Sequence, residues 1–194
     1  MSSARKPRAS LSRPQEFWVF GYGSLMWDPG FDFEDRAAAL LRGYHRAFCI
    51  VSHRHRGTKE NPGLVLGLAP GGSCLGRAYR VADHKVEEVL AYLDDREMPD
   101  YVYIPRTVPV RLYDETGQLG IQVAAHTYVA DVLQTDRCLT RLTMEQTAVF
   151  IRRGVGQRGP NTDYLANTIE HLDELGIKEG RLHALLDIVQ GQGG

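Results

Sequence analysis

The chain has 194 residues, of which 43% are hydrophobic and 24% are charged. This length suits a single domain with a substantial core and is too short for two comfortable ones. A formal net charge of -1 gives no overall attraction to nucleic acid or to a membrane surface, and no apolar run approaches the length of a membrane span. We therefore expect a soluble, cytoplasmic protein that acts on a small polar molecule, without nucleic acid or membrane partners.

The two ends of the chain differ in composition from the rest. Residues 1–15 are basic and rich in serine and proline, and residues 190–194 are glycine and glutamine. Both have too little apolar content to pack, so we expect a disordered tail, a single domain at 16–189 and a flexible tail after it. The three cysteines are odd in number and widely spaced, which argues against a disulfide framework and a zinc cluster. They are expected to be reduced thiols, with Cys49 buried.

The stretch from Phe17 to Phe20 is an aromatic and β-branched run, which predicts a buried strand. It breaks into Gly21-Tyr22-Gly23-Ser24, where the two glycines are expected to adopt backbone angles that a Cβ would forbid. Such a loop can turn successive N–H groups towards one point, where they hold a carboxylate or a developing oxyanion. On these residues alone, an ordinary turn at the end of a strand is the better explanation.

Further segments have strand character and are separated by glycine-containing turns, such as the one expected at residues 70–72. They are Tyr44–Ser52, Leu64–Ala69, Cys74–Val81, Val102–Leu112 and Ile121–Val129. With the first strand, this makes about six. Helices are expected from Asp83 to Pro99, from a Thr143 capping box to Gly154, from Asn161 to Gly176 and from Leu182 to Val189.

The helix that begins at Asp83 has one apolar stripe. Its members are Val86, Val89, Leu90 and Leu93. Glu97 falls in the same stripe, whereas Asp95 falls on the opposite, solvated face. A carboxylate forced into apolar surroundings has a raised pKa, which suits proton transfer near neutral pH. From helical phase alone, a structural ion pair from Glu97 to Arg77 or Arg80 is at least as good an explanation.

A polar cluster occupies residues 53–59, with the sequence His-Arg-His-Arg-Gly-Thr-Lys. His53 and His55 would share one face of a strand, but no third ligand of matching kind is near, so metal binding has weak support. The cluster fits equally well a solvated basic loop and a patch at the mouth of a pocket that attracts a small acid. The later link at 155–160 is rich in glycine and fits either a plain helix connector or a pocket wall.

Four short motifs follow one another along the chain. They are Gly21-Tyr22-Gly23-Ser24-Leu25, His55-Arg56-Gly57-Thr58 with Pro62-Gly63, Tyr92-Leu93-x-x-Arg96-Glu97, and Gly156 to Leu165 with Asn161 and Tyr164. This combination, at fitting separations over about residues 17–186, resembles the ChaC-like gamma-glutamylcyclotransferases. The resemblance implies an α+β fold, in which a small mixed β-barrel of about six strands is surrounded by helices.

The resemblance also implies an activity, the cleavage of glutathione into 5-oxo-L-proline and L-cysteinylglycine without a metal or organic cofactor. By analogy with the catalytic glutamate of the family, Glu97 would be the general acid and base. The implied substrate-binding residues are Tyr22, Gly23, Ser24, Leu25, Met26, Trp27, Tyr103, Arg54 and Tyr164. Many relatives have a glycine directly before the tyrosine, whereas residues 98–102 intervene here, which leaves Tyr101 as an alternative to Tyr103.

Two rival functions stand beside this one. The first is a cyclotransferase of the same superfamily that acts on other γ-glutamyl amino acids or amines, using the same loop and the same glutamate. The second is a non-catalytic regulatory module that binds a γ-glutamyl compound. The His-Arg-Gly-Thr segment favours glutathione by resemblance, and substrate profiling separates the two enzymes. A binding module would tolerate Glu97→Ala, whereas an enzyme would not.

Overall fold

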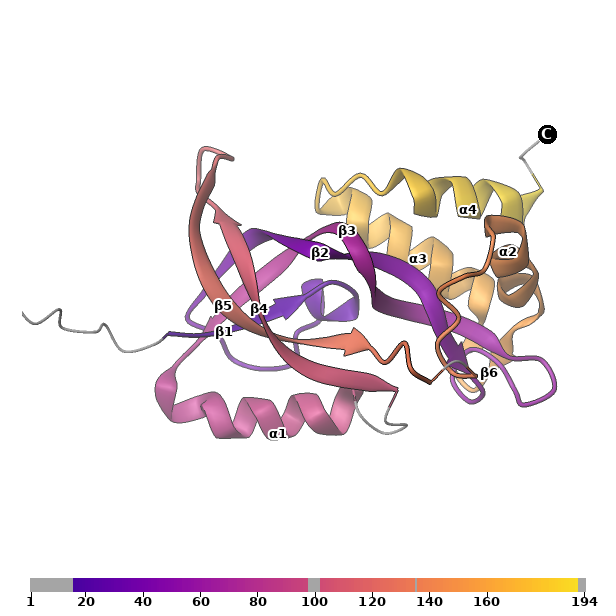
Figure 1. The fold of residues 1–194 in the computed structure, drawn as a ribbon, viewed down its shortest axis with the longest axis horizontal. Coiled ribbons are helices and arrows are strands. Elements are labelled where there is room, and N and C mark those ends of the chain that lie inside the picture. Colours follow the sequence, from indigo (N-terminus) through magenta and orange to yellow (C-terminus); the bar gives the residue numbers. More distant parts are fainter. Residues whose placement is uncertain (1–15, 98–101, 135, 192–194) are drawn as a thin grey trace, which may run out of the picture.

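The computed structural model describes residues 16–97, 102–134 and 136–191. Its centre is a closed barrel with the strand order β1-β3-β2-β4-β5 (Figure 1). The strands are β1 (Phe17–Gly21), β2 (Asp35–Ser52), β3 (Gly63–Val81), β4 (Tyr103–Tyr113) and β5 (Leu119–Ala130). Neighbouring strands are antiparallel except for β1 and β5, which close the barrel as a parallel pair. The mixed β-barrel expected from the resemblance is therefore confirmed.

The barrel has five strands rather than the expected six. The expected strands Leu64–Ala69 and Cys74–Val81 are one continuous strand, β3, because the chain bends at residues 70–72 without leaving the sheet. The two glycines of this bend have φ values of 93° and 72°, and Gly43 on the paired strand β2 has a φ of 88°. The register of pairing shifts beside Gly43. Both strands therefore bend together at a bulge, and the glycines that suggest a turn serve this bend instead.

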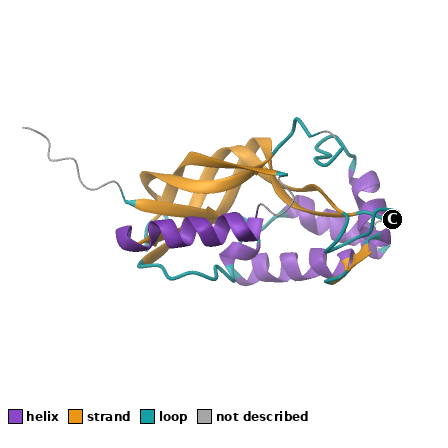
Figure 2. Ribbon diagram, turned by 90° about the horizontal axis from the view of Figure 1, so that it is seen from below, coloured by secondary structure: helices purple, strands orange, loops and turns teal. Residues whose placement is uncertain are grey.

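Among the described residues, four α-helices pack around the barrel. They are α1 (Val86–Glu97), α2 (Met144–Arg153), α3 (Asn161–Glu174) and α4 (Gly180–Gln190). Helix α1 runs along one side of the barrel, and the other three gather at its far end (Figures 1 and 2). The capping box at Thr143 and the end of α2 at Gly154 are confirmed. A 3-10 turn, η2 (Asp83–Lys85), precedes α1.

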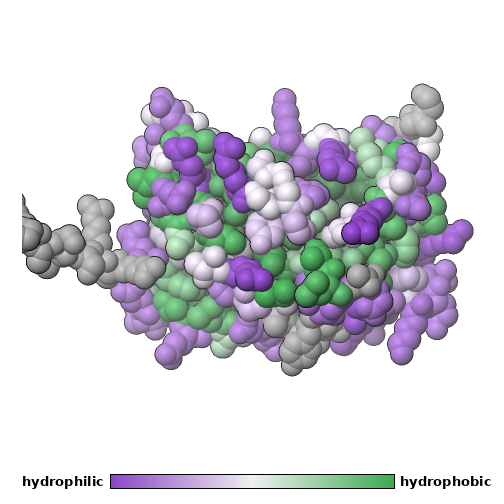
Figure 3. Space-filling model, viewed as in Figure 1, coloured by the Kyte–Doolittle hydropathy of each residue, from purple (hydrophilic) through white to green (hydrophobic). Residues whose placement is uncertain are grey.

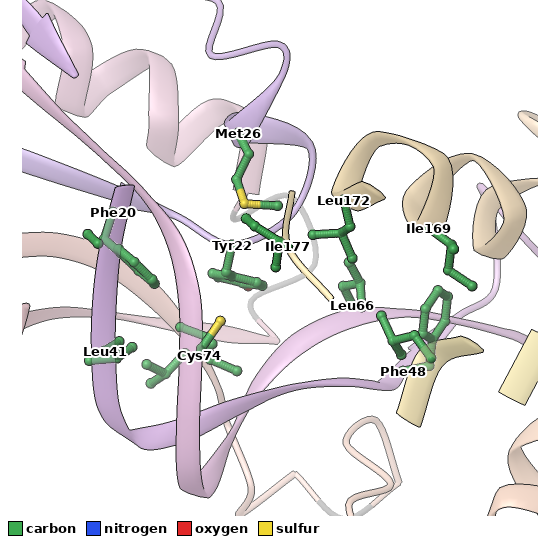
Figure 4. Close-up of a cluster of buried hydrophobic side chains, with 14 of the residues drawn as sticks. Phe20, Tyr22, Met26, Leu41, Phe48, Leu66, Cys74, Ile169, Leu172 and Ile177 are labelled. Atoms are coloured by element: carbon green, nitrogen blue, oxygen red, sulfur yellow. The ribbon is translucent and has the colours of Figure 1, made fainter. Parts of the chain in front are cut away.

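Among the described residues, the core has three parts, and two of them meet at β1. Phe20 belongs to the larger part, which fills the barrel with Leu41 and continues towards α2, α3 and α4 (Figure 4). Val19 belongs to the other part, where it packs with Val89 and Leu93 of α1. Successive side chains of β1 thus point to opposite apolar faces, which explains why this strand has a continuous apolar sequence.

All three cysteines lie in described parts of the chain, where each is buried and free. Burial raises the pKa of the Cys74 thiol to about 11, and the pKa of Cys49 is raised by its hydrogen bond to Cys138 and by burial. The expectation of buried thiols is confirmed, and neither of these groups is a thiolate at neutral pH.

The expected tail at residues 1–15 and the last residues, 192–194, lie outside the described residues, while Gln190 still belongs to α4. None of the helices in the described ranges has both the length and the apolar character needed to cross a membrane. Hydrophobic and hydrophilic side chains are interspersed over the face shown in Figure 3.

Candidate active site

Residues 22–27, which follow β1, form a tight loop that we call the glycine loop. It contains a 3-10 turn, η1 (Ser24–Met26). The Met26 N–H donates to the Gly23 carbonyl at 2.9 Å, and the Trp27 N–H donates to the Ser24 carbonyl at 3.2 Å. These internal bonds give the loop a defined shape, and the expected passage from a buried strand into a tight loop is confirmed.

Side chains of the barrel hold the carbonyl groups of the glycine loop. Arg46, which is buried on β2, donates from Nε to the Tyr22 carbonyl. The Tyr79 hydroxyl on β3 lies 2.9 Å from the Leu25 carbonyl and 2.8 Å from the Met26 carbonyl. Burial raises the pKa of Tyr79, so the hydroxyl keeps the proton that it shares with these carbonyls. The carbonyl side of the loop is therefore fixed from inside the protein.

Three N–H groups of the glycine loop, unlike its carbonyls, lack partners in the described part of the chain. Within the described ranges, the N–H groups of Gly23, Ser24 and Leu25 have no hydrogen-bond acceptor. Three successive donors without acceptors, on a loop whose carbonyls from Tyr22 to Met26 are engaged, form a group that can hold a carboxylate or an oxyanion. This is the arrangement that the sequence analysis considered for the loop.

The side chains of the loop divide into two kinds. Those of Tyr22, Leu25 and Met26 are buried, at 8%, 6% and 0% exposure. Ser24 and Trp27 are partly exposed. Three of the expected binding residues therefore anchor the loop in the core with their side chains.

Neither glycine has a positive φ. Gly23 has a φ of -128° and a ψ of -132°, a combination outside the helical and extended regions. Gly21 is required for a different reason, a close approach. A Cβ on Gly21 would lie 2.9 Å from the Leu25 Cβ, whereas a Cβ on Gly23 would lie 3.5 Å from Leu66 Cδ1, an ordinary contact.

We expect Gly21→Ala to lower the free energy of unfolding by about 1–3 kcal/mol, because the added methyl group must displace the turn at Leu25. Gly23→Ala is the matched control for stability, since its methyl group meets no close neighbour. Urea unfolding of the wild type and both variants measures the difference. Equal stability of the two variants would show that the close approach at Gly21 has no energetic consequence.

Arg96 ties the C-terminal end of α1 to the glycine loop. Its Nη2 lies 2.8 Å from Ser24 Oγ, and its Nη1 lies 2.9 Å from the Asp28 carbonyl. The same Nη1 lies 2.8 Å from the hydroxyl of Tyr92, one turn earlier on α1. Glu97, the expected catalytic residue, follows Arg96 and is the last residue of α1. The Arg96 side chain therefore links the end of α1, where Glu97 lies, to the glycine loop.

The apolar stripe expected on α1 is confirmed as far as Leu93. Val89 and Leu93 are 3% and 0% exposed, and Asp95 is exposed, as expected. Glu97 follows one helical turn after Leu93, on the same face by helical phase. The direction of its side chain lies outside the described part of the structure, and its burial stays a prediction.

The two arginines considered as structural partners of Glu97 have contacts of their own. Arg77 Nη1 donates to the Met26 carbonyl at 3.0 Å. Arg80 Nη1 lies 3.0 Å from a carboxylate oxygen of Glu34. The contacts of Glu97 itself lie outside the described part of the structure, so the choice between an ion pair and a catalytic role stays a prediction.

Tyr103 is the first residue of β4 and is half-buried. Its hydroxyl donates to the Leu66 carbonyl at 2.8 Å. The Leu66 side chain also borders the space beside Gly23. Leu66 thus links the start of β4 to the glycine loop. Tyr101, the alternative to Tyr103, lies outside the described residues.

Arg54 and Tyr164 lie in a second group of contacts. Arg54 Nε donates to Gln157 Oε1 at 3.0 Å, and the Arg56 guanidinium lies 4.9 Å from the centre of the Tyr164 ring. The ring of Tyr164 also packs edge-on against Phe48. The glycine-rich link is a small hairpin between β6 (Val155–Gly156) and β7 (Gly159–Pro160), and Figure 1 shows β6 at the far end of the molecule from α1.

The structure thus brings the glycine loop, the end of α1 and the start of β4 together, and places Arg54 and Tyr164 with the β6–β7 hairpin instead. Sequence reasoning missed the residues that support the loop from behind, above all Arg46. One signal could have found it. Arg46 shares strand parity with Phe48, so it faces the buried side of β2. Trp27 also has an unexpected neighbour, because its ring stacks at 4.5 Å on His171 of α3.

Known proteins resemble this chain over nearly its whole length. The family described as ChaC-like protein matches residues 17–192. The glutathione-specific gamma-glutamylcyclotransferase of Escherichia coli (strain K12) is 35% identical over 192 residues, covering 95% of this chain and 80% of that protein. Glutathione-specific gamma-glutamylcyclotransferase 1 of Homo sapiens is 33% identical over 196 residues, covering 97% and 86%.

The fold has a solved counterpart. The crystal structure of the yeast gamma-glutamyl cyclotransferase specific to glutathione superposes with a TM-score of 0.75 at 25% identity, covering 92% of this chain and 97% of that one. The matched family segment contains every strand of the barrel and the four helices. With its barrel, its glycine loop and the adjoining end of α1, the chain belongs to the ChaC-like protein family.

Proposed function

We propose that this protein is a glutathione-specific gamma-glutamylcyclotransferase, which cleaves glutathione into 5-oxo-L-proline and L-cysteinylglycine. The relatives from Escherichia coli and Homo sapiens and the yeast crystal structure bear names with that specificity. The observation that carries the proposal is the hydrogen bond between Arg96 and Ser24. It sets a helix that ends in a glutamate against a loop whose carbonyls from Tyr22 to Met26 are engaged and whose N–H groups at residues 23–25 are available.

The reaction is an intramolecular acyl transfer. The α-amine of the γ-glutamyl group attacks its own γ-carbonyl carbon, a C–N bond closes the five-membered ring, and the bond to the nitrogen of cysteinylglycine breaks. Because both reacting groups belong to one molecule, the protein mainly has to fold the substrate into the reactive geometry. Protons must also move, since the α-ammonium has to lose one before it attacks and the leaving nitrogen has to gain one.

Glu97 performs this proton transfer in the proposal. Its carboxylate takes a proton from the α-ammonium and returns one to the leaving amine, so it ends the cycle as it began. Helical phase puts Glu97 on the same face of α1 as the buried Leu93, so the proposal gives its carboxyl apolar surroundings, which raise a carboxyl pKa. A raised pKa lies closer to neutral pH, so the carboxyl both accepts and releases a proton more easily.

The glycine loop holds the γ-glutamyl group in the proposal. The N–H groups of Gly23, Ser24 and Leu25 donate to the α-carboxylate or to the oxyanion that forms when the amine attacks. The half-exposed Trp27 supplies an apolar wall, and its stacking on His171 limits the positions of the indole ring. Tyr103, at the start of β4, orients the substrate or the catalytic carboxylate through its hydroxyl.

The test is an assay of the purified protein with reduced glutathione, with chromatography for 5-oxoproline and cysteinylglycine. γ-Glutamyl-alanine is assayed in parallel. We expect both products from glutathione in equal amounts and little turnover of γ-glutamyl-alanine. Turnover of γ-glutamyl-alanine alone would contradict glutathione as the substrate but would agree with the proposed ring-closing reaction. Binding of glutathione without turnover would contradict the proposal that the protein is an enzyme, and it would favour a regulatory module.

A further inference from the structure

Arg46 is a buried cation that reaches the glycine loop from inside the protein. Its side chain has 0% exposure, and its Nε donates to the Tyr22 carbonyl. Its Nη2 donates to the Leu75 carbonyl at 2.8 Å and lies 3.6 Å from Met26 Sδ. Its Nη1 forms an ion pair with Glu179. Every nitrogen of the guanidinium therefore has a partner, and two of the partners belong to the loop.

The ion pair connects parts of the chain that are distant in sequence. Arg46 lies on β2, whereas Glu179 lies directly before α4 and is 22% exposed. A buried guanidinium is costly to remove from water unless a carboxylate and further acceptors surround it. Glu179 supplies the charge, and the carbonyls supply the remaining acceptors. The need to pair Arg46 thus holds β2, the glycine loop and the start of α4 in one arrangement.

The bond to the Tyr22 carbonyl has a consequence on the other side of the same peptide group. The carbonyl of Tyr22 and the N–H of Gly23 belong to one planar trans unit, so fixing the carbonyl fixes the N–H in the opposite direction. A charge-assisted bond to the carbonyl also polarises that N–H and makes it a stronger donor. The peptide needs such an anchor, because glycine permits many backbone angles that other residues exclude.

We propose that Arg46, held in place by Glu179, is a positioning residue that fixes the Tyr22–Gly23 peptide so that the Gly23 N–H receives the γ-glutamyl group. This inference rests on the proposed function, because it assigns the substrate to the N–H side of the loop. Arg46 does not touch the substrate and acts through the peptide alone.

The first test compares Arg46→Met and Arg46→Lys with the wild type in steady-state assays with glutathione. We expect Arg46→Met to raise KM by about tenfold or more, the size of one lost charge-assisted contact. Arg46→Lys keeps the charge, but a single ammonium cannot reproduce the planar fork of donors, so its KM lies between the other two.

A second comparison tests the part played by Glu179. Glu179→Gln keeps the shape of the side chain and removes the charge, so we expect a smaller rise in KM than in Arg46→Met. The double variant with Arg46→Met and Glu179→Gln should have the KM of Arg46→Met alone, because both residues act through one guanidinium. A double variant whose effects multiply would overturn the role of Glu179 as the holder of Arg46.

The control for a merely structural role is Ile151→Ala. Ile151 is a fully buried residue of α2, and its truncation destabilises the core without removing any of the hydrogen bonds that hold the loop. Partial unfolding lowers the concentration of active protein and therefore the apparent kcat, while KM stays unchanged. Amide hydrogen exchange adds a second readout. Exchange in the segment 21–27 should be faster in folded Arg46→Met and unchanged in Ile151→Ala.

The outcomes separate the positioning role of Arg46 from the proposed cyclotransferase function. An unchanged KM together with unchanged exchange of the segment 21–27 in folded Arg46→Met would overturn the positioning role. A wild-type protein that turns over no γ-glutamyl compound would overturn the proposed function. In that case hydrogen exchange alone still decides whether Arg46 fixes the loop.

Discussion

We expect Glu97→Gln to lose about 10²–10⁴-fold in kcat for the cleavage of glutathione, the range typical for removal of a general acid and base. Glutamine is nearly isosteric with glutamate and keeps a carbonyl oxygen, but it does not accept the proton of the α-ammonium. The fold should be unaffected, since the substitution removes a charge at the end of α1 and no packing volume. Single-turnover assays and thermal unfolding of the same preparation measure the two effects.

Asp95→Asn is the matched control on the same helix. Asp95 is exposed and lies two residues before Glu97, so Asp95→Asn removes the same charge from the solvated face of α1. We expect its kcat to equal that of the wild type. A Glu97→Gln enzyme as active as Asp95→Asn would contradict the proposed proton transfer and leave Glu97 without a catalytic role.

Arg96→Met should lower kcat/KM by about 10²-fold, the size of effect that a misplacement of about 1 Å can have on an oriented reaction. Methionine fills a similar volume but cannot bond to Ser24 Oγ or to the Asp28 carbonyl. The end of α1 is then free to shift relative to the glycine loop, so the catalytic carboxylate and the bound substrate lose their alignment. Steady-state kinetics with glutathione over a wide concentration range measure the loss.

Arg106→Met serves as the control for the loss of one positive charge. Arg106 is exposed on β4, and it should keep the kinetics of the wild type. Rescue distinguishes alignment from folding: Arg96→Lys retains part of the contact to Ser24 and should recover part of the activity. Full activity in Arg96→Met would mean that the tie between α1 and the loop is dispensable, which would remove the main support for the proposed site.

The details of the fold that were predicted wrongly share one physical cause, which is pairing between strands. The glycines at residues 71 and 72 suggest a turn because positive φ values are common in turns, yet here they allow two paired strands to bend around the barrel. The beginning of β2 at Asp35 was not expected either. Its first residues are largely alanine and leucine, which favour helices, and their extended conformation comes from pairing with β3 rather than from local preference.

The candidate site divides in a similar way. Helical phase placed Glu97 on the buried stripe of α1, and the break from the apolar run to glycine marked the loop after β1. Neither pattern predicts the contact from Arg96 to Ser24, because that contact joins a helix end to a loop that is distant in sequence. The grouping of Arg54 and Tyr164 with the β6–β7 hairpin likewise depends on how the chain closes around the barrel.

By itself, the sequence determined the features that depend on neighbours along the chain: the strand β1, the capping box of α2, the apolar stripe of α1 and the family motifs in their order. These follow from side-chain periodicity and from local hydrogen bonding. Only the tertiary structure decided which groups meet at the site. The burial of Arg46 against the Tyr22 carbonyl and Glu179, and the bonds from Tyr79 to the Leu25 and Met26 carbonyls, arise from closing a barrel, where pairing is set by contacts between distant segments.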